Sequence, residues 1–281
     1  MRQQQLSVHG RDIAYVESEG TGPAVLFVHG NSSSSGVWAP LLGGEFGARF
    51  RCLAIDLPGH GRSAPAERAD DYSLPGYAAV LAGFARLSGA EDAVLVGWSL
   101  GGHIVLEAAA ELAGAAGLLV FGAPPVSGAA DFGRAFLPSP ALKIGFVDEV
   151  DAEGAEAYAR GFLVPGSTLP VGDLVADILA TDGTARTSLF ASLVGGRFTD
   201  EVGIVGGLDR PLAVLQGEGE QFVSLEYLRG LTMPTLWRGE VQLIPGSGHA
   251  PQVEAPEVVA ELVGRFVREV GEVGEVGEVG E

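Results

Sequence analysis

Short runs of consecutive apolar residues recur along the chain between turn-forming residues. These runs are rich in Val, Leu and Ile, and they lack the polar alternation of a half-exposed strand, as expected of strands that helices cover on both faces. They occupy residues 24–28, 52–55, 93–96, 117–121, 212–216 and 241–244. Helix-period segments, such as 77–87 and 104–112, lie between them. The pattern predicts an α/β fold with a mostly parallel, doubly wound sheet.

Two segments depart from this alternation of apolar runs and helix-period segments, and they define the expected domain organisation. The first is the N-terminal stretch "QLSVHGRDIAYVES", which alternates apolar and polar residues around His9 and Gly10 and predicts an antiparallel hairpin at one edge of the sheet. The second is the long span between the apolar runs that end at Phe121 and begin after Pro211. Its pieces have helical periodicity and are split by Gly and Pro, which predicts an inserted helical cap.

The expected core therefore comprises residues 1–124 and 208–268, and the expected cap, or lid, comprises residues 125–207. The last segment, 269–281, repeats Val, Gly and Glu with a period of three residues. Each unit carries an acid and a glycine, so we expect this tail to be disordered and solvated.

Charge and composition limit the classes of molecule that we expect the protein to bind. With 17 basic and 36 acidic residues, the formal net charge is −19, so we expect neither nucleic acid nor an anionic membrane to bind, and a small molecule to be the substrate. The only cysteine, Cys52, lies in an apolar run, where it acts as a small hydrophobe. We find no secretion signal, membrane span, metal-ligand spacing or dinucleotide fingerprint, so we expect a cytoplasmic protein without a cofactor.

The segment that carries chemistry is Gly97-Trp98-Ser99-Leu100-Gly101, at the junction of an apolar run and a helical pattern. A Gly-x-Ser-x-Gly sequence between a strand and a helix predicts a nucleophile elbow, a sharp turn that exposes the serine. The helix that begins at Leu100 would direct its N-terminal N–H groups toward charge that develops there. Ser99 is therefore the candidate nucleophile.

A serine hydroxyl needs a base to become a good nucleophile, and histidine is the usual one. His249 follows an apolar run in a glycine-rich loop before the last helix, which places it at the carboxyl edge of the sheet with Ser99. The other histidines have structural interpretations: a hairpin turn for His9, loop bracing for His29, a tight turn for His60 and a helix position for His103. Two carboxylates compete to orient His249, and we favour Glu220 over Glu218 because the chain has two more residues in which to turn.

The oxyanion of a tetrahedral intermediate requires N–H donors. One is expected to be the backbone N–H of Leu100, and the other that of Asn31 in the loop "HGNSSSSGVW", with Ser32 as the alternative. Residues that could border the substrate pocket are Trp98, His29, Trp38 and Phe136. The competing interpretations are packing in the core for Trp98 and Trp38, bracing of the loop for His29, and packing of the cap on the sheet for Phe136.

Five segments carry a resemblance to a known family: "FVHGN" (27–31), "DLPGHGRS" (56–63), "GWSLGG" (97–102), "LQGEGEQFV" (215–223) and "PGSGHAPQVEAPE" (245–257). In this order and spacing they resemble the α/β-hydrolase superfamily, in particular its capped branch. The resemblance implies the α/β-hydrolase fold, with Ser99 as nucleophile and His249 as base, while Glu220 stands where the family usually has Asp.

This resemblance also implies an activity. Epoxide hydrolases and haloalkane dehalogenases of the branch attack with a carboxylate, so a serine at position 99 favours acyl transfer instead. We expect a serine hydrolase, of the class that acts on ester bonds, that cleaves a small-to-medium carboxylic ester through an acyl-enzyme. The alternatives are a carbon–carbon bond hydrolase or perhydrolase with the same triad, and a ligand receptor that does not turn over.

Overall fold

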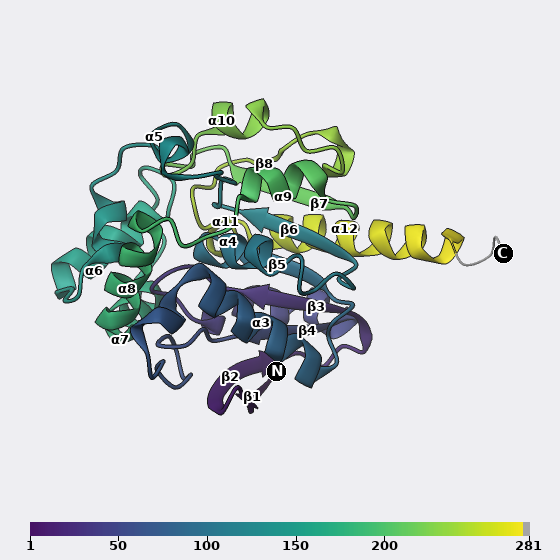
Figure 1. The fold of residues 1–281 in the computed structure, drawn as a ribbon, viewed down its shortest axis with the longest axis horizontal. Coiled ribbons are helices and arrows are strands. Elements are labelled where there is room, and N and C mark those ends of the chain that lie inside the picture. Colours follow the sequence, from purple (N-terminus) through teal and green to yellow (C-terminus); the bar gives the residue numbers. More distant parts are fainter. Residues whose placement is uncertain (278–281) are drawn as a thin grey trace.

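The computed structural model describes residues 1–277. A single eight-stranded sheet runs through the protein in the order β1-β2-β4-β3-β5-β6-β7-β8 (Figure 1). Its strands are β1 (Arg2–Val8), β2 (Arg11–Glu17), β3 (Gly22–Val28), β4 (Phe50–Ile55), β5 (Val94–Trp98), β6 (Gly117–Phe121), β7 (Leu212–Gly217) and β8 (Gln242–Ile244). All neighbouring pairs from β4 to β8 are parallel. β1 and β2 pair antiparallel, and β2 pairs antiparallel with β4, which confirms the predicted N-terminal hairpin.

Helices complete the layers on the two faces of the sheet. They are α1 (Ala39–Leu42), α2 (Glu45–Arg49), α3 (Leu74–Ser88), α4 (Leu100–Glu107), α5 (Phe132–Ala135), α6 (Ala152–Gly161), α7 (Gly172–Ala180), α8 (Gly183–Val194), α9 (Glu201–Gly207), α10 (Leu225–Gly230), α11 (Pro251–Glu254) and α12 (Pro256–Gly277). Short 3₁₀ helices are η1 (Ser35–Trp38), η2 (Ala69–Tyr72), η3 (Ala129–Asp131), η4 (Ala141–Phe146) and η5 (Trp237–Gly239). None of the helices described in residues 1–277 is long and apolar enough to cross a membrane.

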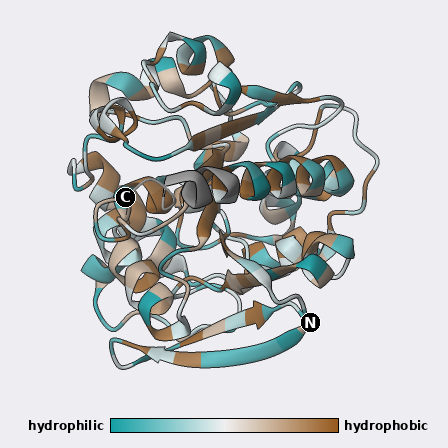
Figure 2. Ribbon diagram, turned by 90° about the vertical axis from the view of Figure 1, so that its right-hand side faces the viewer, coloured by the Kyte–Doolittle hydropathy of each residue, from teal (hydrophilic) through white to brown (hydrophobic). Residues whose placement is uncertain are grey.

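The central strands are buried from end to end, as their unbroken apolar runs predict. β5 and β6 are buried at every position. The edge strand β1 instead alternates exposed and partly buried residues and is largely hydrophilic at the lower edge of Figure 2. A strand with one solvent-exposed face needs this alternation, whereas a strand that helices cover on both faces does not.

Helix α3 shows how local signals set the ends of an element. Ser73 caps its N-terminus by accepting a hydrogen bond from Gly76 N–H, and proline occupies its first turn. The helix ends at Gly89, whose φ of 62° lies in the left-handed region that glycine tolerates. Its buried face then packs against α4, the helix that follows Ser99.

The chain between β6 and β7 forms only helices and loops apart from one isolated bridge, Phe136 to Val223. Helices α5 to α8 gather beyond the ends of β5 and β6, at the left of Figure 1. Helix α9 instead returns to the sheet and packs against α4. That residues 125–207 form one separate cap stays a prediction. Helix α9 falls within this range but packs against α4, a helix of the predicted core.

The predicted start of a disordered tail at residue 269 is wrong. Helix α12 continues to Gly277. Glu269 accepts hydrogen bonds from Trp237 and Arg238, and Val270 is buried. The physical reason is an apolar stripe at helical spacing, Val259, Val263, Phe266, Val267 and Val270, which extends into the repeat. The remainder of the predicted tail, 278–281, lies outside the described residues.

Candidate active site

Ser99 lies in a strained turn between β5 and α4. Its φ of 53° and ψ of −121° are unusual for any residue other than glycine. The turn is fixed by a hydrogen bond of 2.9 Å from Ser99 N–H to the carbonyl of Phe121 on β6. A Cβ atom on Gly97 would overlap the backbone of Gly101. The flanking glycines are therefore required by close backbone approach, as the elbow motif predicts.

The structure brings His249 and Glu220 together beside this turn. His249 Nδ1 lies 2.8 Å from Glu220 Oε2, and both side chains are almost fully buried. The other carboxylate oxygen, Oε1, accepts a hydrogen bond of 2.7 Å from the backbone N–H of Phe222. Glu218 is exposed and makes no hydrogen bond to His249. Of the two competing carboxylates, Glu220 is thus the one that contacts the histidine.

Three neighbours hold the His249 ring in place. Trp98 Nε1 donates a hydrogen bond of 2.7 Å to the backbone carbonyl of His249, and the Phe222 ring packs 4.8 Å away. Gly122, with φ of 64°, lies against the imidazole, and a Cβ atom there would stand 2.7 Å from His249 Cε1. The ring therefore occupies space that only a glycine leaves free.

The loop after β3 lies on the other side of Ser99. A Cβ atom on Gly30 would be 3.1 Å from Ser99 Cβ, which shows how closely this loop approaches. Asn31 and Leu100 line the same cavity as Ser99, and neither backbone N–H has a hydrogen-bond partner in the described chain. The Asn31 side chain instead donates to the carbonyl of Gly145 in η4, at 2.6 Å. Ser32, the alternative donor, has φ of 57° and does not line the cavity.

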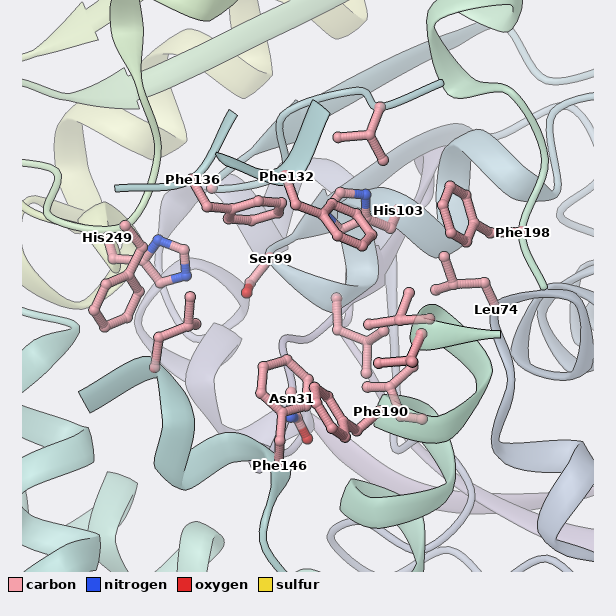
Figure 3. Close-up of a pocket in the computed structure, with 18 of the residues that line it drawn as sticks. Asn31, Leu74, Ser99, His103, Phe132, Phe136, Phe146, Phe190, Phe198 and His249 are labelled. Carbon is pink, nitrogen blue, oxygen red and sulfur yellow. The ribbon is translucent and has the colours of Figure 1, made fainter. Parts of the chain in front are cut away.

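A cavity of about 280 Å³ opens from Ser99 between the sheet and the helices of the insertion (Figure 3). Its wall is mostly aromatic and aliphatic, and among residues 1–277 no Lys or Arg belongs to it. Phe136, predicted as a pocket residue, lines this cavity together with Phe132, Phe146, Phe190 and Phe198. A cavity of this kind suits the apolar part of a small ligand.

The pocket assignments of Trp98, Trp38 and His29 are wrong. All three are fully buried and none lines the cavity. Trp98 turns inward and supports His249, while Trp38 packs on Phe27 at a ring distance of 4.9 Å. For the two tryptophans the competing interpretation, packing in the core, holds, because burial of a large apolar ring is strongly stabilising.

His29 braces the loops around the site. Its Nε2 accepts a hydrogen bond from Leu57 N–H at 3.0 Å, and Nδ1 lies 2.7 Å from the carbonyl of Gly30. The ring packs 5.2 Å from that of His60. Burial lowers the pKa of His29, and burial together with His29 lowers the pKa of His60 to about 3. Both rings are therefore neutral structural groups near pH 7.

Sequence reasoning missed two polar residues of the cavity wall. Tyr158, from α6, lines the cavity, and a Cβ atom on Gly145 would clash with its hydroxyl and lie 3.2 Å from Asn31 Nδ2. Burial raises the pKa of Tyr158, so its hydroxyl stays protonated. His103, from α4, also lines the cavity. Its position four residues after Ser99, one helical turn along the same face, is the signal that could have identified it.

Comparison with known proteins agrees with the observed fold. The profile of the alpha/beta hydrolase family matches residues 25–262. A 2-(acetamidomethylene)succinate hydrolase of Mesorhizobium japonicum (strain LMG 29417 / CECT 9101 / MAFF 303099) is 27% identical over 278 residues, 92% of each chain. A pimeloyl-[acyl-carrier protein] methyl ester esterase of Xylella fastidiosa (strain 9a5c) is 30% identical over 263 residues, 90% of this chain and 98% of its own.

Among solved structures, a mutant of the N-acyl homoserine lactonase AidH in complex with N-hexanoyl homoserine lactone superposes with a TM-score of 0.92. It is 35% identical, and the match covers 97% of this chain and 99% of that one. This chain belongs to the alpha/beta hydrolase family. It is a hydrolase with the fold that the five sequence segments predict.

Proposed function

We propose that this protein is a serine hydrolase that cleaves carboxylic esters, lactones included, that carry a largely apolar chain. The observation that carries the proposal is that Ser99 and His249 line the same apolar cavity while Glu220 lies 2.8 Å from Nδ1 of His249. Similarity to an esterase and to a lactonase supports the same bond type. An N-acyl homoserine lactone is a candidate substrate because the AidH structure, 35% identical, contains one.

In the proposed reaction, Ser99 Oγ attacks the ester carbonyl while His249 Nε2 accepts its proton. Glu220 holds His249 with the proton on Nδ1 and stabilises the imidazolium that forms. The backbone N–H groups of Leu100 and Asn31 would donate to the oxyanion, at the positive end of α4. Collapse of the intermediate expels the alcohol, which takes the proton from His249 and leaves an acyl-enzyme on Ser99.

Water completes the cycle. His249 removes a proton from the water molecule that attacks the acyl-enzyme, and the second intermediate releases the carboxylic acid as Ser99 regains its proton. When the substrate is a lactone, the alcohol and acid remain in one hydroxy acid product.

The same cavity argues against the carbon–carbon bond hydrolase alternative. That chemistry requires groups that hold an acidic dienol or diketone, and the cavity wall contains no Lys or Arg. A neutral ester with an apolar acyl chain matches the wall better.

Turnover of graded p-nitrophenyl esters, from acetate to long chains, and of N-hexanoyl homoserine lactone tests the proposal. We expect multiple turnovers with wild type and a loss of at least about 10⁴-fold in kcat for Ser99→Ala, the scale of triad removal. The mutant should retain the wild-type circular dichroism spectrum. A Ser99→Ala protein with a tenth of wild-type activity would exclude Ser99 as nucleophile.

A further inference from the structure

A second histidine–carboxylate pair lies in the same cavity. His103 Nδ1 is 2.8 Å and 3.0 Å from the two carboxylate oxygens of Glu201, the first residue of α9. Glu201 is fully buried, and the side chain of His103 is 14% exposed. In the view of Figure 3, His103 and His249 lie on opposite sides of Ser99. The proposed reaction makes no use of this pair.

Glu201 fixes the direction of the His103 ring. Because the carboxylate accepts from Nδ1, the proton of the imidazole is held on that nitrogen, and Nε2 lies on the opposite side of the ring. Nε2 has no hydrogen-bond partner in the described part of the chain, and it is not among the fully buried unpartnered atoms. Since His103 lines the cavity, Nε2 is available to a ligand there.

The surroundings of this nitrogen are apolar. Phe136 packs 6.2 Å from the His103 ring, and Phe132 and Phe198 complete this part of the wall. Of the other polar side chains of the wall, Ser99 and His249 belong to the proposed reaction and Asn31 donates to the Gly145 carbonyl, while the Tyr158 hydroxyl lies against Gly145 without a hydrogen bond in the described residues. A purely alkyl ligand would leave Nε2 without a partner, which is costly in an apolar environment.

A purely structural role does not require this arrangement. Glu201 already joins α9 to the loop after β6, because its backbone N–H donates to the Val126 carbonyl and its carboxylate accepts from Val126 N–H, both at 3.0 Å. The additional bond to His103 orients a ring at the cavity wall. This is the arrangement by which a buried carboxylate prepares a histidine to contact a ligand.

We propose that His103, positioned by Glu201, is a specificity residue that hydrogen-bonds a hydroxyl group on the acyl chain of the substrate. The inference rests on the proposed ester hydrolysis and names the substrate class more closely. The backbone N–H of His103 donates a hydrogen bond of 3.3 Å to the carbonyl of Ser99, and both side chains line the cavity. With a hydrogen bond of about 2.8 Å, Nε2 can reach an oxygen on the third carbon of the chain. A hydroxyl can donate to a neutral imidazole or accept from a protonated one.

The test compares p-nitrophenyl 3-hydroxybutyrate with p-nitrophenyl butyrate. The measured quantity is the ratio of their kcat/KM values, which cancels effects on the triad and on folding. We expect His103→Phe to lower this ratio by roughly tenfold relative to wild type, the effect of one hydrogen bond. His103→Gln, whose amide can donate and accept, should retain part of the preference. His103→Leu provides a second apolar replacement should His103→Phe not fold.

Leu87→Ala, at an exposed position of α3 away from the cavity, is the control and should leave the ratio unchanged. An unchanged ratio in folded His103→Phe or His103→Leu overturns the inference. Calorimetric binding of both esters to Ser99→Ala, with and without His103→Phe, measures the same preference without turnover. Absence of hydrolysis by wild type would reject the proposed function, while the binding ratio would still support or overturn the role of His103.

Discussion

Glu220 reaches His249 although its side chain is one methylene longer than the Asp that usually occupies this place in the superfamily. The extra length is accommodated because Oε1 is anchored by Phe222 N–H while Oε2 faces Nδ1 of the imidazole. The turn after β7 thus fixes the direction of the Glu220 side chain toward His249. A Glu at this position can therefore orient the histidine as an Asp would.

Substitution of the two neighbouring glutamates separates this role from general charge effects. Glu220→Gln should lower kcat by about 10³- to 10⁴-fold, because an amide can stabilise the wrong tautomer of His249 and cannot stabilise its charged form. Glu218→Gln removes the same charge from an exposed position and is expected to change kcat by less than about twofold. Steady-state turnover of a p-nitrophenyl ester measures both, and a larger loss in Glu218→Gln would reverse the assignment.

At the residue scale, the sequence predicted which of the proposed triad residues lie close together better than it predicted the lining of the pocket. Ser99, His249 and Glu220 follow strand ends, and parallel strand ends meet at one edge, so their proximity follows from local pattern. The directions of Trp98 and Trp38 depend on which side of a turn each ring packs, and this is decided by tertiary burial. Tyr158 reaches the cavity from an inserted helix whose placement no local signal indicates.

At the scale of elements, helix α7 of the insertion is joined to the loop that carries Asn31. Ser34 Oγ donates a hydrogen bond of 2.8 Å to Asp177 Oδ2, and Asp56 is nearby. Burial, with a smaller contribution from the negative charge of Asp56, raises the pKa of Asp177 to about 6. The ionised form of this carboxyl therefore destabilises the folded protein at neutral pH.

The pH dependence of stability should reveal this contact. Because the pKa of Asp177 is higher in the folded than in the unfolded chain, folding takes up a proton, and the contribution to stability rises as pH falls from about 6 to about 4. Asp177→Asn should raise the free energy of unfolding at pH 8 by about 2 kcal/mol and remove this component. Urea unfolding at a series of pH values measures the effect.

The exposed Asp173, also on α7, supplies the control for that experiment. Asp173→Asn removes the same charge from the same helix; because Asp173 makes a smaller contribution than burial to the raised pKa of Asp177, most of the wild-type pH dependence should remain. Parallel profiles for wild type and Asp177→Asn would show that the burial of Asp177 does not shift its protonation.

At the scale of the whole molecule, an apolar cavity lies where the insertion meets the carboxyl edge of the sheet. The size of this cavity should set the length of the acyl chain that the protein prefers. Phe198 lies beyond His103 from Ser99 in Figure 3 and packs 5.8 Å from Phe132. Phe198→Ala should enlarge this end and move the chain-length optimum for kcat/KM by about two carbons toward longer esters. Leu87→Ala, at an exposed position of α3, should leave the optimum unchanged.

The sequence alone predicted the sheet, the edge hairpin and the helical character of the insertion. It could do so because the spacing of apolar residues reflects which faces are buried and turn residues mark where elements end. The arrangement of α5 to α8 around the cavity could not, since short helices joined by Gly and Pro are compatible with many packings. The end of α12 was also missed, because an acid- and glycine-rich composition concealed the apolar stripe that reaches Val270.

Covalent labelling of the nucleophile tests the central claim most directly. Ser99 Oγ of the native protein should attack the phosphorus of a fluorophosphonate, forming a P–O bond and releasing fluoride to solvent, and mass spectrometry of the peptides should place one adduct on Ser99. Replacement of His249 by Ala, or heat denaturation before labelling, should abolish the adduct because both remove the activated hydroxyl. Absence of labelling in catalytically active wild type, or an adduct on another residue, would contradict the assignment of Ser99 as nucleophile.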